Sequence, residues 1–259
     1  MSQDRPILEI RNLGKKFGGL QALNNVTISV RQGEIASFIG PNGAGKTTLF
    51  NMICRLYPPS SGEILYEGKN LLRYRPHHLP TLGIGRTFQN LALFRHGTVI
   101  ENLLVGMHSH LKSGVLDGAF YLGPTAAEEC RAREEVERIV EFLEIEEIRN
   151  QPVSMLPYGL QKRVEMGRAL ATRPRLLLLD EMVSGMNQEE TEDIARFVLD
   201  LRDELGLTVI MIEHDMNVVM DISDSVHVLN FGTPIASGPP EEVAANPAVI
   251  DAYLGQGAS

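Results

Sequence analysis

The spacing of apolar and polar residues along the chain predicts where its strands and helices lie. From Ile7 to Val30 apolar and polar residues alternate, which predicts antiparallel strands, and the segment 31–34 supplies the turn that ends this small β layer. Ile35–Ile39 is an apolar run that leads through a glycine-rich loop into a helix expected from Lys46 to about Leu56. A further strand is expected from Gly62 to Tyr66. This order predicts the opening of an α/β unit.

The second half of the chain alternates helices with buried strands. The segment 70–124 is rich in Gly, His and Pro and has no clear period, whereas apolar residues recur at helical spacing over 125–146. The later elements are helices over 160–172 and 188–205, strands over 176–179 and 208–212, a hairpin over 226–237 and a short helix from Pro247. Their order predicts a parallel sheet with helical crossovers.

Composition narrows the classes of function. With 259 residues, 43% hydrophobic and 22% charged, the chain has the make-up of a globular protein, and its net charge of -9 with scattered basic residues argues against a nucleic-acid partner. Cys54 and Cys130 lie in stretches expected to be helical, as in a reduced compartment. Residues 1–11 lack the features of a signal peptide, and no apolar run approaches the roughly 20 residues of a membrane span. We expect a cytosolic chain whose membrane partners, if any, are separate.

A phosphate-binding loop is the clearest chemical motif. The pattern G-x-x-x-x-G-K-S/T is matched between the expected strand and helix by Gly40, Pro41, Asn42, Gly43, Ala44, Gly45, Lys46 and Thr47, with Thr48 next. Glycines let backbone N–H groups turn toward phosphate oxygens, where the helix dipole adds positive potential. Lys46 would reach the β and γ phosphates of ATP, and the Thr47 hydroxyl would bind Mg²⁺. A chance glycine-rich turn is the alternative, and the flanking elements argue against it.

Two acids follow a buried strand, at the sheet edge where open α/β sheets bind ligands. Leu176–Leu179 precedes Asp180 and Glu181. Asp180 is suited to hold Mg²⁺ through water, and Glu181 is suited to polarise the water that attacks the γ-phosphate. Alone, this motif is equally well explained as a strand with an acidic turn. Together with the phosphate loop it indicates nucleotide hydrolysis.

These motifs resemble the ATP-binding cassette (ABC) ATPases along nearly the whole chain. The resemblance implies an α/β fold with a P-loop NTPase (RecA-like) core, a mostly parallel sheet, an N-terminal antiparallel β subdomain and an inserted α-helical subdomain. It implies one ABC ATPase domain over 1–259. The catalytic core and β subdomain would be about 7–89 and 166–259, and the helical subdomain with the signature about 90–165.

The resemblance also assigns roles that the residues alone do not. Gln89, in Gly85–Asn90, matches the glutamine that senses the γ-phosphate and Mg²⁺. His214 matches the switch histidine that contacts the γ-phosphate, although alone one of seven histidines would be read as a surface or structural residue. Phe17 matches the aromatic residue that stacks on adenine, although alone it would be assigned to the core.

The family signature is altered in this chain. Leu156, Pro157, Tyr158 and Gly159 stand at the helix start that, in the family, faces the ATP of the opposite subunit in a head-to-tail dimer. Pro157 removes a hydroxyl and a backbone N–H, so this half-site is expected to be weakened and not abolished. Two further departures are Met182, where a proline commonly follows the acids, and Asn187, where an aspartate is usual.

The departures are similar to those of the high-affinity branched-chain amino-acid importers, and 107–129 resembles the larger of their two ATPases. The resemblance implies a peripheral subunit on the cytoplasmic face of the inner (plasma) membrane, with a second ABC ATPase, transmembrane permeases and an extracytoplasmic substrate-binding protein. Urea importers and lipopolysaccharide exporters share much of the pattern. A soluble ABC ATPase of ribosomes or DNA is a competing class, disfavoured by the single cassette. A regulatory module without turnover is disfavoured by Glu181 and His214.

Overall fold

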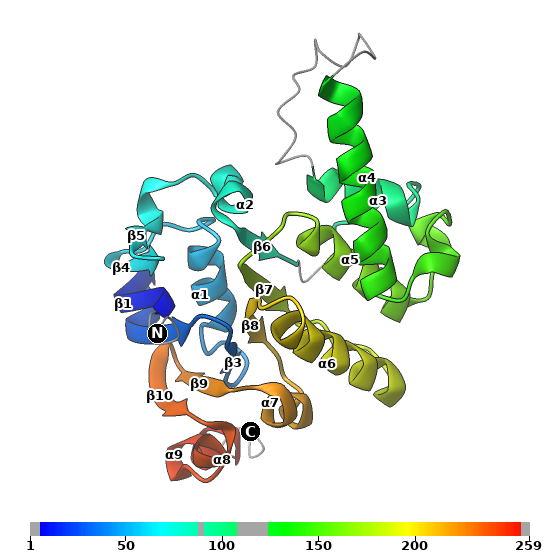
Figure 1. The fold of residues 1–259 in the computed structure, drawn as a ribbon. Coiled ribbons are helices and arrows are strands. Elements are labelled where there is room, and N and C mark those ends of the chain that lie inside the picture. Colours follow the sequence, from blue (N-terminus) through cyan, green and yellow to red (C-terminus); the bar gives the residue numbers. More distant parts are fainter. Residues whose placement is uncertain (1–5, 88–90, 108–123, 255–259) are drawn as a thin grey trace. The chain divides into compact units, whose positions relative to one another are not determined.

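The computed structural model describes residues 6–87, 91–107 and 124–254, and the described residues fall into two compact units (Figure 1). The first unit lies within 1–79 and 178–259, and the second within 80–177. The strands are β1 (Pro6–Phe17), β2 (Leu20–Arg31), β3 (Ile35–Ile39), β4 (Ser61–Tyr66), β5 (Lys69–Asn70), β6 (Ile84–Arg86), β7 (Leu176–Asp180), β8 (Thr208–Ile212), β9 (Ser225–Asn230) and β10 (Thr233–Gly238). The α-helices are α1 (Lys46–Ile53), α2 (Leu79–Leu82), α3 (Val99–Met107), α4 (Pro124–Phe142), α5 (Tyr158–Leu170), α6 (Gln188–Asp203), α7 (Met216–Ile222), α8 (Pro240–Ala244) and α9 (Pro247–Leu254).

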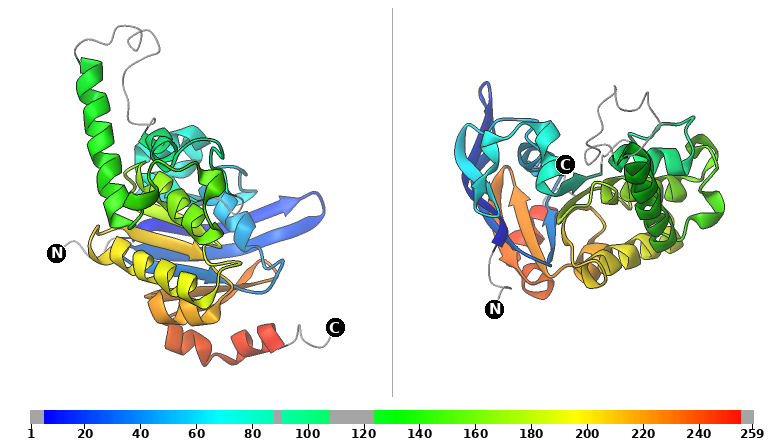
Figure 2. Two further views of the ribbon diagram at one scale, coloured as in Figure 1. Left: turned by 90° about the vertical axis from the view of Figure 1, so that its right-hand side faces the viewer. Right: turned by 45° about the horizontal axis from the view of Figure 1, so that its top comes forward.

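The N-terminal sheet confirms the predicted antiparallel layer. Its strand order is β2-β1-β4-β5, and β1 and β2 run side by side as a long ribbon, drawn in blue in Figure 2. Ile10 pairs with Ile28 and Leu13 with Val26, and all four side chains are buried. In β2 the alternation of apolar and polar positions places one row of side chains in the core, whereas in β1 a register shift between Ile10 and Leu13 allows both of these residues, three positions apart, to be buried.

The second sheet contains the predicted buried strands, in the order β10-β9-β3-β8-β7-β6. β3 pairs in parallel with both β8 and β9, and β10 closes the hairpin antiparallel to β9. All residues of β3, β7 and β8 are buried, as expected of strands covered on both faces. A mostly parallel α/β core, as the sequence predicts, is confirmed.

Two helix ends in this structure differ from the prediction for a local reason. α1 ends at Ile53 and not near Leu56, because Arg55 takes a left-handed backbone (φ 61°) and the Leu56 N–H donates back to the Asn51 carbonyl. Cys54 therefore lies just past the helix. Similarly α4 ends at Phe142 and not near 146, because Glu144 has a left-handed φ of 55°.

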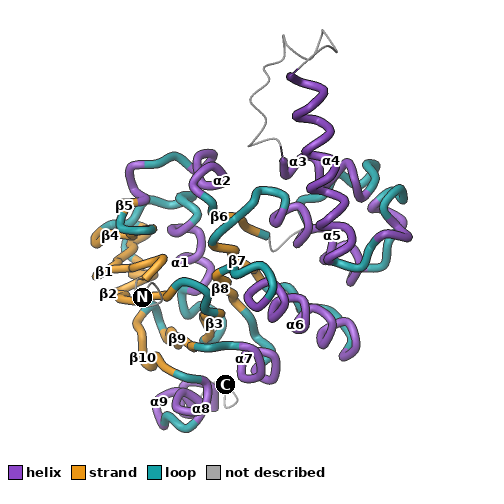
Figure 3. The backbone as a smooth tube through the Cα atoms, in the orientation of Figure 1, coloured by secondary structure: helices purple, strands orange, loops and turns teal. Residues whose placement is uncertain are grey.

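The unit within 80–177 consists mainly of helices (Figure 3). α3 packs against both α4 and α5, and α4 also contacts α5. At Gly167 of α5 an added Cβ would lie 2.9 Å from the Leu143 side chain, so the absence of a side chain there lets the helices approach closely. α2, α3 and β6 arise from the segment whose pattern predicted no element.

Candidate nucleotide site

The phosphate loop joins β3 to α1 through a series of left-handed turns. Gly40, Gly43 and Gly45 have φ values of 144°, 78° and 103°, a region that favours glycine. An added Cβ would lie 2.1 Å from the Leu229 carbonyl oxygen at Gly40, whereas at Gly43 it would meet no atom within 4 Å. The loop is therefore packed against β9 at its start and open at its middle. Asn42 and Gly43 are exposed, as a loop that receives phosphates requires.

Lys46 begins α1 and is buried, with 5% of its surface exposed. Its Nζ donates to the carbonyl oxygens of Gly40 at 2.5 Å and Pro41 at 3.1 Å. Burial lowers the pKa of Lys46, and the Glu181 carboxylate acts in the opposite direction. Lys46 is thus held inside the loop and lies within electrostatic reach of Glu181.

The hydroxyl and carboxylate predicted for magnesium come from two elements of the same unit. Thr47 is exposed on the first turn of α1, and Thr48 beside it is half-buried. Asp180 is the last residue of β7, and only 1% of it is exposed. Both side chains offer the hard oxygen ligands that Mg²⁺ prefers.

Glu181 and His214 lie together at the ends of β7 and β8. Glu181 Oε1 is 2.9 Å from His214 Nε2, and the Glu181 N–H donates to the Ile212 carbonyl at 2.9 Å. Glu181 has a left-handed φ of 51°, which is unfavourable for a residue with a side chain and recurs at functional sites. The structure therefore brings together the two residues that the sequence suggested for hydrolysis.

Phe17 ends β1 and is accompanied by two residues that the sequence did not suggest. Its ring stands edge-on to Tyr57 with centroids 5.4 Å apart, and Lys15 Nζ lies 4.7 Å from the Phe17 centroid. Phe17 is 41% exposed, so part of the ring is open to solvent. β2, which pairs with β1, lies against the phosphate loop, because the Leu23 side chain would lie 2.7 Å from a Cβ at Gly45. Because Tyr57 follows α1, no local signal connects it with Phe17.

The altered signature lies in the helical unit. Pro157 is the N-cap of α5, without a side-chain hydrogen bond, and Tyr158 is the first helical residue. Leu156 and Gly159 are buried, whereas Pro157 and Tyr158 are exposed. The helix start thus lies two residues before the predicted Leu160 and exposes the altered positions. Gln89, also predicted for the site, lies outside the described residues.

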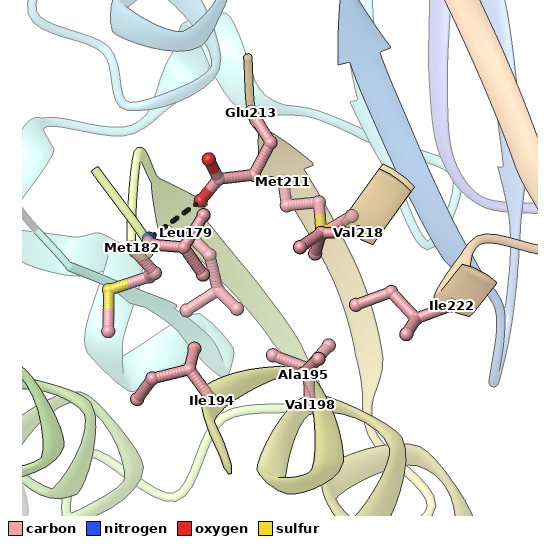
Figure 4. A pocket seen from close by; sticks show the side chains of 10 residues that line it. Leu179, Met182, Ile194, Ala195, Val198, Met211, Glu213, Val218 and Ile222 are labelled. Carbon is pink, nitrogen blue, oxygen red and sulfur yellow. Dashed lines mark hydrogen bonds between the residues drawn. The ribbon is translucent and has the colours of Figure 1, made fainter. Parts of the chain in front are cut away.

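Glu213 is a buried acid between β8 and His214 that sequence reasoning passed over. Its Oε1 accepts a hydrogen bond from the Val183 N–H at 3.2 Å (Figure 4). Burial raises its pKa to about 7, and backbone N–H groups of Val183, Met182 and His214 oppose this shift. Its signal in the sequence was an acid that directly continues a strand of apolar residues.

Comparison with known proteins places these observations in a family. Residues 23–184 match the ABC transporter family, and residues 233–259 match the branched-chain amino acid ATP-binding cassette transporter family. No described helix is both long and apolar enough to cross a lipid bilayer.

Two curated relatives and one solved structure extend over almost the whole chain. The high-affinity branched-chain amino acid transport ATP-binding protein BraF of Pseudomonas aeruginosa is 44% identical, over 97% of this chain and 99% of its own. LivG of Salmonella typhimurium, which carries the same descriptive name, is 43% identical over 99% of this chain and all of its own. The ADP conformation of an ATP-binding cassette of an ABC transporter superposes with a TM-score of 0.85 at 34% identity, covering 97% and 99% of the two chains. The chain therefore belongs to the ABC transporter family, as an ATP-binding subunit that hydrolyses ATP.

Proposed function

We propose that this chain powers an importer of branched-chain amino acids by binding and hydrolysing Mg²⁺-ATP at the edge formed by the phosphate loop and the ends of β7 and β8. The observation that carries the hydrolytic site is the convergence of Lys46, Glu181 and His214 on one edge of one sheet. The substrate is supported by the relatives' names and by the match of 233–259 to a branched-chain amino acid transporter family.

Each residue of the site has a separate task in this proposal. Backbone N–H groups of 40–47 and the Lys46 ammonium bind the phosphates, and Phe17 holds adenine against its exposed ring surface. Glu181 accepts a proton from the attacking water, and His214 fixes the Glu181 carboxylate through their 2.9 Å contact. By the resemblance to the family, Gln89 would couple ATP binding to the helical unit.

Magnesium fits the donors present at this edge. The Thr47 hydroxyl and the Asp180 carboxylate, with Gln89, would hold it, and their oxygens match its preference. When bound, Mg²⁺ neutralises charge on the phosphate oxygens. The buried position of Asp180 keeps that carboxylate at the strand end without contact with bulk solvent.

The subunit is proposed to work in an assembly. A second ABC ATPase, identical or different, would pair head to tail, so that 156–159 faces the partner's ATP. Transmembrane permeases would hold the pair at the cytoplasmic face of the inner membrane, and an extracytoplasmic binding protein would deliver the amino acid. The proposed domain boundaries remain 7–89 with 166–259 for the core and 90–165 for the helical subdomain.

A hollow on the helical unit suits a permease segment. It is lined by Phe94, Arg95, His96, Gly97, Glu101 and Val105. Phe94 and Val105 are 58% and 45% exposed, which is high for large apolar side chains. Replacing Phe94 by Ser should release the chain from membranes that contain the permeases while its ATP affinity stays unchanged. Retention on those membranes would assign the docking surface elsewhere.

Calorimetry and uptake test the proposal at two levels. The purified chain should bind ATP only with Mg²⁺ present, and Lys46→Ala should abolish that binding. Cells that lack the gene should lose uptake of labelled leucine, isoleucine and valine, and Glu181→Gln should not restore it. Magnesium-independent binding, or binding by Lys46→Ala, would overturn the site.

The alternative cargoes are separated by the same cells. Loss of urea uptake with normal amino-acid uptake, or a defect in lipopolysaccharide export, would replace the proposed substrate and leave the ATP site standing. Co-purification of the chain with ribosomes or DNA, without permeases, would replace the transport role itself.

A further inference from the structure

Two hydrogen bonds join the loops after β7 and β8, in addition to the Glu181–His214 contact. The Glu181 N–H donates to the Ile212 carbonyl at 2.9 Å, and two residues later the Val183 N–H donates to Glu213 Oε1 at 3.2 Å. The first bond links backbone to backbone. The second depends on one side chain, which a substitution can remove.

Glu213 occupies an apolar place for an acid. Only 4% of it is exposed, and it borders a cavity of about 10 Å³. Figure 4 shows the carboxylate directed toward Met182, with apolar side chains below it. An acid buried in such a place is costly unless hydrogen bonds satisfy it. The apolar lining includes Leu179, Met182, Ile194, Val198, Met211 and Val218.

The donors that stabilise this carboxylate come from both loops. Backbone N–H groups of Val183, Met182 and His214 all favour the charged form of Glu213. A proline at position 182 would have no N–H to donate. Met182 therefore supplies a donor beside Glu213 that a proline would remove.

Glu213 and His214 act on the same neighbouring loop from successive positions. The Glu213 carboxylate binds the backbone just after Glu181, while His214 Nε2 contacts the Glu181 carboxylate. Glu181 itself has a left-handed φ, so its conformation needs support from its surroundings. A bond two residues away restricts the loop that carries this unfavourable conformation.

We propose that Glu213 is a positioning residue for ATP hydrolysis, which clamps the loop 181–183 to the His214 loop and so fixes the Glu181 carboxylate against His214. The inference rests on the proposed roles of Glu181 and His214. The clamp requires a side chain that is long enough to bring an acceptor oxygen to the Val183 N–H, as Glu213 does.

Three substitutions of Glu213 separate reach from charge. Glu213→Gln keeps length and an acceptor oxygen, so kcat should stay within about threefold of wild type. Glu213→Asp keeps the charge but withdraws the oxygens by one methylene, and Glu213→Leu removes the acceptor. Both should lower kcat about 10- to 100-fold, as expected when a catalytic group is displaced by about 1 Å. The KM for ATP should change less than about twofold, because the phosphate loop is untouched.

The readout is steady-state hydrolysis by the full chain assembled with its transporter subunits, with ATP affinity measured separately by calorimetry. Val198→Ala is the matched control, since it removes packing from the same cavity without touching the clamp. It should lower stability and leave kcat unchanged. A double-mutant cycle adds a test that loss of stability alone would not meet: the effects of Glu213→Asp and His214→Ala on kcat should be less than additive.

Wild-type kcat in Glu213→Asp, or additive effects with His214→Ala, would overturn the clamp. A loss in Glu213→Gln equal to that in Glu213→Asp would also overturn it, because the acceptor is retained there. Glu181→Gln serves as the reference for the underlying site. If it hydrolyses ATP at the wild-type rate, the proposed role of Glu181 fails. If it is inactive while all Glu213 variants are normal, only the clamp fails.

Discussion

Gly40 and Gly43 stand three residues apart in the phosphate loop and both have a positive φ, yet their surroundings differ. At Gly40 a Cβ would lie 2.1 Å from the Leu229 carbonyl oxygen, a backbone atom that cannot rotate away. At Gly43 the space is open. Glycine is thus required at the first position by packing and conformation, and at the second by conformation alone.

Alanine at these two positions should therefore give different losses of stability. We expect Gly43→Ala to reduce the free energy of unfolding by about 1 kcal/mol, the penalty for a left-handed residue with a side chain. Gly40→Ala should cost at least about 3 kcal/mol, because strain adds to that penalty. Denaturant unfolding of both variants measures the difference. Equal losses would show that the backbone of β9 shifts at Leu229 and relieves the steric contact with the added methyl group.

One of the residues that depart from the family pattern, Asn187, has a structural role at the start of a helix. Asn187 is the N-cap of α6, and its side chain accepts from the Glu190 N–H at 3.0 Å. The Glu190 carboxylate accepts from the Asn187 N–H at 3.1 Å, which completes a capping box. Asparagine and aspartate cap helices about equally well, so the replacement of the usual aspartate leaves the helix start intact.

Substitution of Asn187 should separate capping from charge. Asn187→Ala should lower the free energy of unfolding by about 1 kcal/mol, whereas Asn187→Asp should change it by less than about 0.5 kcal/mol. Thermal and denaturant unfolding of the two variants provide the measurement. A loss in Asn187→Asp as large as that in Asn187→Ala would mean that something other than the cap determines stability here.

Burial shifts the pKa values of two groups, His227 and Glu213, in opposite directions. His227 of β9 is 5% exposed, bonds to Ser237 Oγ at 2.8 Å and stands edge-on to Phe38. Burial lowers its pKa from 6.5 to about 4, with Glu34 opposing. Burial raises the pKa of Glu213 from 4.5 to about 7. In the folded protein both groups therefore favour their neutral forms.

The direction in which each group changes stability with pH depends on whether the folded or the unfolded chain binds more protons at that group. Between pH 4 and 6.5 the unfolded chain binds more protons at His227, so this residue makes stability rise with pH. Between pH 4.5 and 7 the folded chain binds more protons at Glu213, so this residue makes stability fall with pH. Each contribution is on the order of 3 kcal/mol at most. Over the shared window from pH 4.5 to 6.5 the two slopes offset one another.

Removing one group at a time should expose the other. As pH rises from 5 to 7, the stability of His227→Gln relative to wild type should decrease, and that of Glu213→Gln should increase. Urea unfolding at several pH values gives both difference curves, in which groups common to all three proteins cancel. Difference curves of the same sign, or flat ones, would contradict the burial of these groups.

At the scale of the whole molecule, the altered signature predicts unequal ATP sites. In the proposed head-to-tail pair, Pro157 would face the partner's nucleotide without the N–H and hydroxyl that the family uses there. The site built from this chain's Lys46 and Glu181 is then the stronger one if the partner carries the usual signature.

Separate inactivation of the two sites measures the asymmetry. Glu181→Gln should remove most of the ATPase activity of the assembled transporter, whereas the equivalent change in a different partner ATPase should remove less than about half. Pro157→Ser should raise the contribution of the weaker site, since it restores both groups. Equal losses from the two single changes would count against unequal sites.

The elements that the sequence predicted well carry strong local signals. β8 was expected at 208–212 and is found there, and β7 extends the expected 176–179 by one residue, because runs of apolar residues between polar boundaries define buried strands. The helix α3 was missed although its start was readable. Thr98 and Glu101 form a capping box, with N–H to side-chain distances of 2.8 and 3.2 Å. β6, with three residues, is too short to show a period.

By itself the sequence determined the phosphate loop, the acids at the end of β7 and the buried strands β3, β7 and β8, because each depends on residues close together in the chain. Only the tertiary structure decided that His214 contacts Glu181 and that Glu213 holds the backbone at Val183. Both contacts join residues at least 30 positions apart. They exist because β8 lies between β3 and β7 in the sheet, and the choice of strand neighbours is settled by packing of the whole core.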